Sequence, residues 1–367
     1  MAGVALGTPR SGGWSEGDPS GERRFADVGP VRLERGGALP AVRVAYQTWG
    51  RLDPDGGNAV LVEHALTGDS HIAGPAGPGQ PTPGWWDGIV GPGAPLDSDR
   101  LFVVCANVLG GCQGTTGPSS RAPDGGPWGS RFPEITIGDQ VAVEAALADA
   151  LGVHRWAGVV GGSMGGMRVL EWAVSRPDRV SALLVLASTA AASADQIGTQ
   201  TTQQTAIRSD PRWAGGDYAA GEGPVAGLGT ARRIAHLTYR SAYELEERFG
   251  NAVQDDGRFA VTSYLDHHAA KLAARFDAGS YVALTQAMNT WDVGRDRGGV
   301  DAALGRVGAR AVVAGIDSDR LYPIAQQQRV ADALGVPLAT ITSPYGHDGF
   351  LIEIDAVGAL VRELLGT

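Results

Sequence analysis

Short apolar runs, each bounded by polar and glycine-rich turns, recur along most of the chain. Each run has the length of a buried strand rather than that of a long helix. The runs occupy residues 59–64, 101–106, 156–160, 182–187, 310–316 and 338–342. Stretches with helical periodicity alternate with them, at 137–151, at 324–334 and from the last run to Leu365. This alternation predicts a mostly parallel α/β sheet flanked by helices on both faces.

The pattern differs at the start and in the middle of the chain. Residues 1–27 are rich in Gly, Ser, Pro and charge, and we expect a disordered or loosely ordered tail without the features of a signal peptide. Alternating segments between 31 and 49 predict antiparallel strands leading into the domain. From 188 to 300, helix-like stretches such as 230–249 and 264–276 replace the short apolar runs. The predicted organisation is a core of residues 28–187 and 301–367, capped by a helical lid inserted at 188–300.

Composition narrows the classes of partner. The chain has 367 residues and a formal net charge of −10, which argues against a nucleic-acid or anionic-membrane partner. It has two cysteines, Cys105 and Cys112, too few for a disulfide framework, and we interpret the protein as reduced and cytoplasmic. No stretch reaches the roughly 18 apolar residues of a membrane helix. The single lysine, Lys271, follows Ala270, so it cannot belong to a Walker A phosphate loop.

One turn carries a potential nucleophile. The apolar run that starts at Trp156 stops at Gly161-Gly162-Ser163-Met164-Gly165, and a helix-period pattern follows. A strand, a tight turn with a central serine and a helix form the context of a nucleophile elbow, in which small residues must flank the serine. A structural glycine turn is the alternative, because a chain with 55 glycines can contain this motif by chance.

A serine nucleophile needs a base and an orienting acid, which follow it along the chain in the order acid, then histidine. His347 lies between the last predicted strand and the last helix, where a loop can bring an imidazole over the elbow. The acid is ambiguous, because Asp317 and Asp319 both follow the run at 310–316. Either aspartate could instead cap the next helix.

Two further observations concern ligands. No H-x-x-x-H or C-x-x-C spacing occurs, so we predict no metal site. Arg232, Arg233 and Arg240 lie in a helix-like part of the insertion, where an arginine could bind a substrate carboxylate through two parallel hydrogen bonds. A solvated helix face explains the same arginines equally well.

Six strings resemble one family when taken together and in this order. They are HALTGDSH (64–71), ANVLGGCQGTTGPSS (106–120), GGSMGGM (161–167), ARRIAHLTYRS (231–241), SDRLYP (318–323) and YGHDGFL (345–351). The chain resembles the homoserine O-acetyltransferase family of the α/β-hydrolase fold, and the strings extend over nearly all of it after the first 27 residues.

The resemblance implies roles for individual residues. It assigns the acid of the triad to Asp319, and so prefers it to Asp317. It places the oxyanion hole at the backbone N–H groups of Leu66 and Met164. It implies that Arg232 binds the substrate carboxylate and that Asp348 holds the substrate ammonium.

The resemblance also implies a reaction. The expected enzyme is an acyltransferase that moves an acetyl group from acetyl-CoA, its co-substrate, to L-homoserine through an acetyl-Ser163 intermediate, with no other cofactor. The expected setting is methionine biosynthesis by a cytoplasmic homodimer formed through the helical lid. Alternatives are a related serine or homoserine O-acyltransferase, for example one with a succinyl-CoA donor, an esterase of the same fold, and a catalytically silent binding module.

Overall fold

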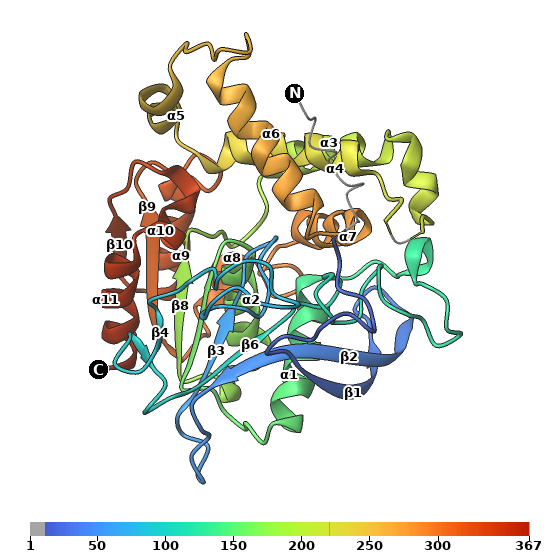
Figure 1. Ribbon diagram of the computed structural model, residues 1–367. Helices are drawn as coiled ribbons and strands as arrows, with labels where there is room; N and C mark the ends of the chain where they lie inside the picture. Colours follow the sequence, from blue (N-terminus) through green and yellow to red (C-terminus); the bar gives the residue numbers. More distant parts are fainter. Residues whose placement is uncertain (1–11, 220, 367) are drawn as a thin grey trace.

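The computed structural model describes residues 12–219 and 221–366, which form a large twisted sheet with helices around it (Figure 1). The sheet has eight strands in the order β1-β2-β6-β3-β7-β8-β9-β10. The strands are β1 (Arg24–Arg32), β2 (Ala38–Trp49), β3 (Ala59–Glu63), β6 (Phe102–Ala106), β7 (Gly158–Gly162), β8 (Ala182–Leu186), β9 (Arg310–Ile316) and β10 (Leu338–Ile341). Strands β1, β2 and β6 pair antiparallel, and all pairs from β6 to β10 are parallel. The predicted mostly parallel sheet is confirmed.

Helices cover both faces of this sheet. The helices are α1 (Ile137–Ala150), α2 (Met164–Ser175), α3 (Ala194–Arg208), α4 (Val225–Tyr239), α5 (Ala242–Phe249), α6 (Ala260–Ala273), α7 (Ala278–Asn289), α8 (Val300–Leu304), α9 (Ile324–Leu334), α10 (Gly349–Ile352) and α11 (Ile354–Leu365). Short 3₁₀ segments occur at η1 (Gly129–Arg131), η2 (Pro177–Arg179), η3 (Pro211–Gly216), which is kinked at Ala214 and Gly215, and η4 (Gly346–Asp348). Among the described residues, no helix is long and apolar enough to cross a bilayer.

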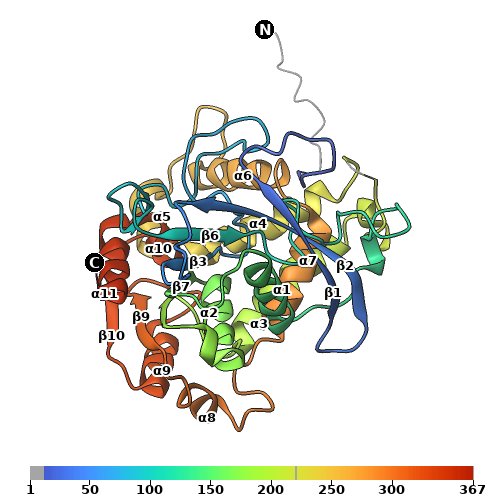
Figure 2. The same ribbon diagram turned by 90° about the horizontal axis from the view of Figure 1, so that it is seen from below.

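The central strands are buried on both faces, which explains their continuous apolar sequences. Successive side chains of a strand point to opposite faces. In β7, Val159 packs into the cluster that contains α1 and α2, whereas Val160 packs into the cluster under α11. Figure 2 shows β1 and β2 at one end of the sheet and β9 and β10 at the other. The parallel strands therefore bring their carboxyl ends to one edge, beneath the helices of the insertion.

The prediction of a disordered or loosely ordered tail at 1–27 is wrong over its last part. Strand β1 begins at Arg24, inside the segment that we expected to be loose. Trp14 donates its backbone N–H to the carbonyl of Cys112, and its ring lies 5.1 Å from that of Phe25. Arg23 is buried and donates to the side chain of Gln113. The contacts of Trp14 and Arg23 therefore order this segment despite its polar composition. Residues 1–11 of the predicted tail lie outside the described residues.

Helices α3 to α7 all fall within the predicted insertion at 188–300, and they lie over the carboxyl ends of the strands (Figure 1). Helix α4 packs against α3 and α6, and it also contacts the turn η4 that carries His347. The helix-like stretch at 230–249 is two helices rather than one. The chain is extended at Arg240, and the hydroxyl of Ser241 accepts from Glu244 N to begin α5. A serine caps a helix better than it continues one.

Candidate active site

Ser163 lies between β7 and α2 in a strained backbone conformation, with φ 58° and ψ −125°. Such a conformation persists only where neighbouring contacts enforce it. Its N–H donates to the carbonyl of Leu186 on β8, and its carbonyl accepts from the hydroxyl of Ser188. A side chain at Gly165 would place its Cβ 2.1 Å from the carbonyl oxygen of Glu63. The glycine therefore lets the end of β3 approach the turn, as a nucleophile elbow requires.

The structure separates the two aspartates that follow β9. Asp319 is buried, and its Oδ2 lies 2.7 Å from Nδ1 of His347. Its Oδ1 accepts the backbone N–H groups of Leu321 and Tyr322 at 2.8 and 2.9 Å, which fixes the carboxylate. Asp317 is exposed and accepts from Ser343 N. Asp319 thus faces the histidine, while Asp317 ties two loops together.

The environment of His347 suits a base that must accept a proton. Burial by itself lowers the pKa of His347, but the charge and hydrogen bond of Asp319, with a further contribution from Asp348, leave that pKa raised above its usual value. Because Nδ1 faces Asp319, the other ring nitrogen, Nε2, is free to receive the proton of a nucleophile.

Two aromatic side chains connect the histidine to the elbow. The ring of Phe350 lies 5.4 Å from that of His347, and a Cβ at Gly162 would fall 2.6 Å from a ring carbon of Phe350. The ring of Tyr322 lies 5.1 Å from His347. Burial raises the pKa of Tyr322, and the hydroxyl of Ser163 beside it opposes that rise. Tyr322 and Phe350 thus each contact both the loop of the base and the elbow.

One expected oxyanion donor, Met164, directly follows Ser163, and the other, Leu66, lies in the turn after β3, the strand next to β7. Met164 begins α2, so its N–H has no acceptor within the helix. Leu66 follows β3 in a turn that His64 holds on both sides, since the His64 Nδ1–H donates to the carbonyl of Ala65 and the Nε2 accepts from Val108 N. Burial, followed by the charge of Arg168, lowers the pKa of His64 to about 3, so this ring stays neutral.

Arg232 and Arg233 face different surroundings. The guanidinium of Arg233 forms an ion pair with Asp266 at 2.7 Å. The guanidinium of Arg232 lies 3.4 Å from the hydroxyl of Thr67, next to the Leu66 turn, and over the ring of Tyr239. Arg232 makes no salt bridge within residues 12–219 and 221–366. It is therefore the member of the pair that is placed and free to bind an anion.

Asp348 already has a partner that sequence reasoning did not assign. Its Oδ2 lies 3.3 Å from Nε of Arg240, at the junction of α4 and α5. Burial raises the pKa of Asp348, while the charges of Arg240, His347 and Arg232 oppose that rise. A substrate ammonium at Asp348 would share the carboxylate with Arg240.

The chain matches the family model of the alpha/beta hydrolase fold over residues 58–353. It is 64% identical to the homoserine O-acetyltransferase of Thermobifida fusca strain YX, over 97% of each chain. The chain belongs to the homoserine O-acetyltransferase family. Esterase E22 is a solved structure with TM-score 0.86 and 26% identity, covering 94% of this chain and 99% of its own. The homoserine O-acetyltransferase structure of Bacillus anthracis has TM-score 0.86 at 24% identity, over 94% and 97% of the two chains, and it supports the fold.

The family strings contained residues whose places sequence reasoning missed. Tyr239 lies in the ARRIAHLTYRS string, and Tyr322 in the SDRLYP string. Both rings line the histidine, at 5.9 and 5.1 Å between ring centroids. Their presence in those strings was the available signal. No group of three or more metal-binding side chains occurs among the described residues.

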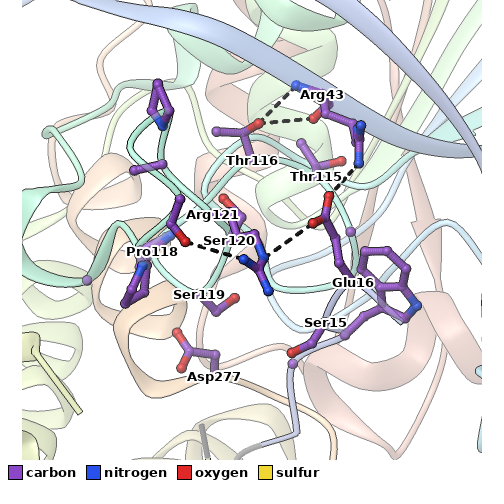
Figure 3. Close-up of a pocket in the computed structure, with 18 of the residues that line it drawn as sticks. Ser15, Glu16, Arg43, Thr115, Thr116, Pro118, Ser119, Ser120, Arg121 and Asp277 are labelled. Carbon is purple, nitrogen blue, oxygen red and sulfur yellow. Dashed lines mark hydrogen bonds and ion pairs between the residues drawn. The ribbon is translucent and has the colours of Figure 1, made fainter. Parts of the chain in front are cut away.

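A separate cavity of about 930 Å³ lies on the far side of the glycine-rich loop at 110–117, and no triad residue lines it. Figure 3 shows Glu16 in it between Arg43 and Arg121, with Asp277 across the space. Arg43 and Arg121 already pair with Glu16, and the cavity offers neither a nucleophile elbow nor the base, so we do not assign the chemistry to it.

The geometry of the two aspartates generates a prediction. Asp319→Asn should lower kcat by about 10⁴-fold, because an amide neither orients His347 nor stabilises its protonated form. The kcat of Asp317→Asn, the matched control, should stay within a few-fold of wild type.

In wild type, the acidic limb of the pH profile of kcat/KM should lie above about 6.5, because the pKa of His347 is raised and only its neutral form accepts a proton. Asp319→Asn should move that limb to lower pH. A larger loss of kcat in Asp317→Asn than in Asp319→Asn would refute the assignment of Asp319 as the acid.

Proposed function

We propose that this protein is an L-homoserine O-acetyltransferase that converts acetyl-CoA and L-homoserine into O-acetyl-L-homoserine and CoA. The observation that carries the proposal is the guanidinium of Arg232, which has no carboxylate partner in the described part of the chain, over Tyr239 and near the buried pair of Asp319 and His347. A hydrolase of simple esters needs no cation at that place, whereas an amino-acid acceptor carries a carboxylate that pairs with it. The 64% identity to a protein named homoserine O-acetyltransferase supports the same substrate.

In the first half-reaction, Nε2 of His347 takes the proton of the Ser163 hydroxyl as the oxygen attacks the thioester carbon. The N–H groups of Leu66 and Met164 stabilise the resulting oxyanion. When the tetrahedral intermediate collapses, the C–S bond breaks and the thiolate of CoA takes the proton from His347. The products are free CoA and acetyl-Ser163.

In the second half-reaction, His347 takes the proton of the homoserine hydroxyl, whose oxygen attacks the acetyl carbon. The same two N–H groups hold the second oxyanion. Collapse breaks the bond to Ser163 Oγ, which recovers its proton from His347. Arg232 and Asp348 position the acceptor through its carboxylate and its ammonium.

Water competes with homoserine for the acetyl-enzyme, so the lid must close the pocket. Helix α4 and the turn after it are tied to the loop of the base. The hydroxyl of Ser241 donates to the carbonyl of Pro344 at 2.5 Å, and a Cβ at Gly346 would fall 2.6 Å from the carbonyl of Tyr239. This contact brings Tyr239 and Arg240 over the histidine and reduces the room for water.

Two other functions are distinguished by simple assays. The first alternative is an esterase, which the structural similarity to esterase E22, at 26% identity, favours. It predicts acetyl-CoA hydrolysis that homoserine does not accelerate. The second alternative is a transferase that uses succinyl-CoA as the donor. Comparing the rate of thiol release from acetyl-CoA with that from succinyl-CoA distinguishes the two donors. We propose acetyl-CoA as the co-substrate and no further cofactor.

We also propose a homodimer formed through the lid. Apolar side chains are exposed on α4, on α5 and in the loop after it, including Tyr243 at 64% and Val253 at 60% exposure. Phe259 and Leu237 are exposed as well, and Phe259 pairs with Val253 in a β-bridge. Exposed apolar side chains gathered on one part of a monomer are typical of an interface.

We further propose a cytoplasmic location, since Cys105 and Cys112 are both free and buried, as in a protein kept reduced. Cell fractionation should recover the protein with a cytoplasmic marker, and recovery with an extracytoplasmic marker would contradict this.

The covalent intermediate gives the central test. Incubation with acetyl-CoA alone should add about one acetyl group to the Ser163 peptide, and double-reciprocal plots with both substrates varied should be parallel. Ser163→Ala should lower turnover by on the order of 10⁶-fold without changing the urea midpoint. Intersecting lines with an unlabelled peptide would favour direct transfer and overturn the proposed mechanism.

The acceptor site is tested with two adjacent arginines. Arg232→Ala should form acetyl-Ser163 at nearly the wild-type rate but transfer it to homoserine on the order of 10²-fold more slowly, because losing a charged partner in a desolvated site costs a few kcal/mol. Hydrolysis of the acetyl-enzyme should then become visible. Arg233→Ala, the control, should affect neither step, since Arg233 pairs with Asp266. Equal slowing of transfer in both variants would remove Arg232 from the acceptor site.

The dimer is tested by sedimentation. Tyr243→Glu combined with Phe259→Glu should convert a dimer to a monomer, because burial of two charges opposes association. Ile352→Glu, an exposed apolar position outside the lid, is the control and should remain dimeric. A monomeric wild type would refute the proposal directly.

A further inference from the structure

A charged cluster is buried directly beneath the elbow. Arg168 on α2 is fully buried, and its Nη1 lies 2.6 Å from Oε2 of Glu63 on β3 and 2.6 Å from Oε1 of Glu144 on α1. The indole N–H of Trp172 donates to the other oxygen of Glu144. The triad chemistry uses none of these groups. Placing three ionisable side chains here costs desolvation energy that an apolar cluster would not.

The cluster has a second connection that points to a role. Nη2 of Arg168 donates at 2.5 Å to the backbone carbonyl of His64, the residue that follows β3. The next residues are Ala65 and Leu66, whose turn carries one oxyanion donor. The ring of His64 holds the same turn by donating to the carbonyl of Ala65. Arg168 thus joins the helix that begins at Met164 to the loop that supplies the Leu66 N–H.

We propose that Arg168 is a positioning residue that sets the separation between the two oxyanion donors, Leu66 N and Met164 N. The inference rests on the proposed function, because it requires an oxyanion to form at Ser163. The glycine at position 165 lets the Glu63 carbonyl approach α2 closely, but a close approach alone leaves the loop free to slide. A guanidinium that donates to the carbonyl of His64 and to the carboxylate of Glu144 fixes the distance and the direction together.

Glu63 and Glu144 interact with Arg168 in different ways. Burial, with the neighbouring Glu144 adding to it, holds the pKa of Glu63 well above its usual value, although the charge of Arg168 opposes this. The raised pKa favours the neutral form of Glu63, and Arg168 donates to Glu144 and forms an ion pair with it. Glu63→Gln keeps the shape and the neutral state, so it should leave both half-reactions within a few-fold of wild type.

The experiment measures each half-reaction separately in four proteins: wild type, Glu63→Gln, Arg168→Met and the triple variant Glu63→Gln/Glu144→Gln/Arg168→Met. Arg168→Met leaves Glu144 without its cation and should lower the urea midpoint. The triple variant carries no buried charge in the cluster and should recover that midpoint. If only stability were at stake, its rates would recover as well.

We expect the rates of the triple variant to stay low. Acetylation of Ser163 and transfer to homoserine should both fall by a similar factor, roughly ten- to a hundred-fold, with little change in either KM, because both steps use the same oxyanion hole. Loss of a whole oxyanion donor costs about 10²–10³-fold in kcat, and a displaced donor retains part of its effect. Damage to the acceptor or the CoA site would slow only one step.

An infrared measurement reports on the hole directly. In acetyl-Ser163 formed from acetyl-CoA labelled with ¹³C at the carbonyl, donors in the hole polarise the C=O bond and lower its stretching frequency. The frequency should rise in the triple variant and not in Glu63→Gln. Wild-type rates or an unchanged frequency in the folded triple variant would overturn the inference. A wild-type protein that forms no acetyl-Ser163 would instead refute the proposed function, so the two failures are distinct.

Discussion

The strained backbone of Ser163 is the constraint on which the rest of the site depends. A serine at φ 58° is held there because its N–H donates to the carbonyl of Leu186 on β8 and its carbonyl accepts from the hydroxyl of Ser188. The turn can be this sharp only because β3, β7 and β8 are adjacent parallel strands that end at the same edge. The glycine at 165 then admits the end of β3 against α2. The order of the strands, their common edge and Gly165 therefore all serve to hold one serine above the end of the sheet.

The base reaches that serine through a second pair of parallel strands. Asp319 follows β9, and His347 follows β10, so both come from the same sheet edge as the elbow. The carboxylate of Asp319 is held by two backbone N–H groups, which leaves its other oxygen for His347. The lid adds the last layer, because Ser241 and Tyr239 contact the loop of the histidine. A movement of α4 away from the core would therefore disturb the base and, on the proposed function, the acceptor site as well.

Sequence patterns predicted the parts of this fold that depend on local periodicity. The strand predicted at 310–316 and the helix predicted at 324–334 coincide with β9 and α9, since apolar periodicity and neighbouring turns agree there. The start of β1 was not predicted, because Arg24 is ordered by contacts such as that of Arg23 with Gln113, 90 residues away along the chain. The choice between Asp317 and Asp319 needed the family strings, since spacing alone allowed either. The Arg240 and Asp348 ion pair and the Arg168 cluster depend on side-chain directions in three dimensions, which one-dimensional spacing does not contain.

The charges around the pocket explain how one fold serves both esterases and acyltransferases. The elbow, acid and base act on an ester or thioester whatever the acceptor is, so they do not choose between water and an amino acid. On the proposed function, that choice belongs to the lid. Arg240 and Asp348 compensate each other, whereas Arg232 has no ionic partner among residues 12–219 and 221–366. On that proposal, an acceptor that brings a carboxylate gives Arg232 a salt-bridge partner, whereas an uncharged alcohol or water does not. On the proposed function, the electrostatics of α4, rather than the chemistry of Ser163, therefore determine which nucleophile completes the reaction.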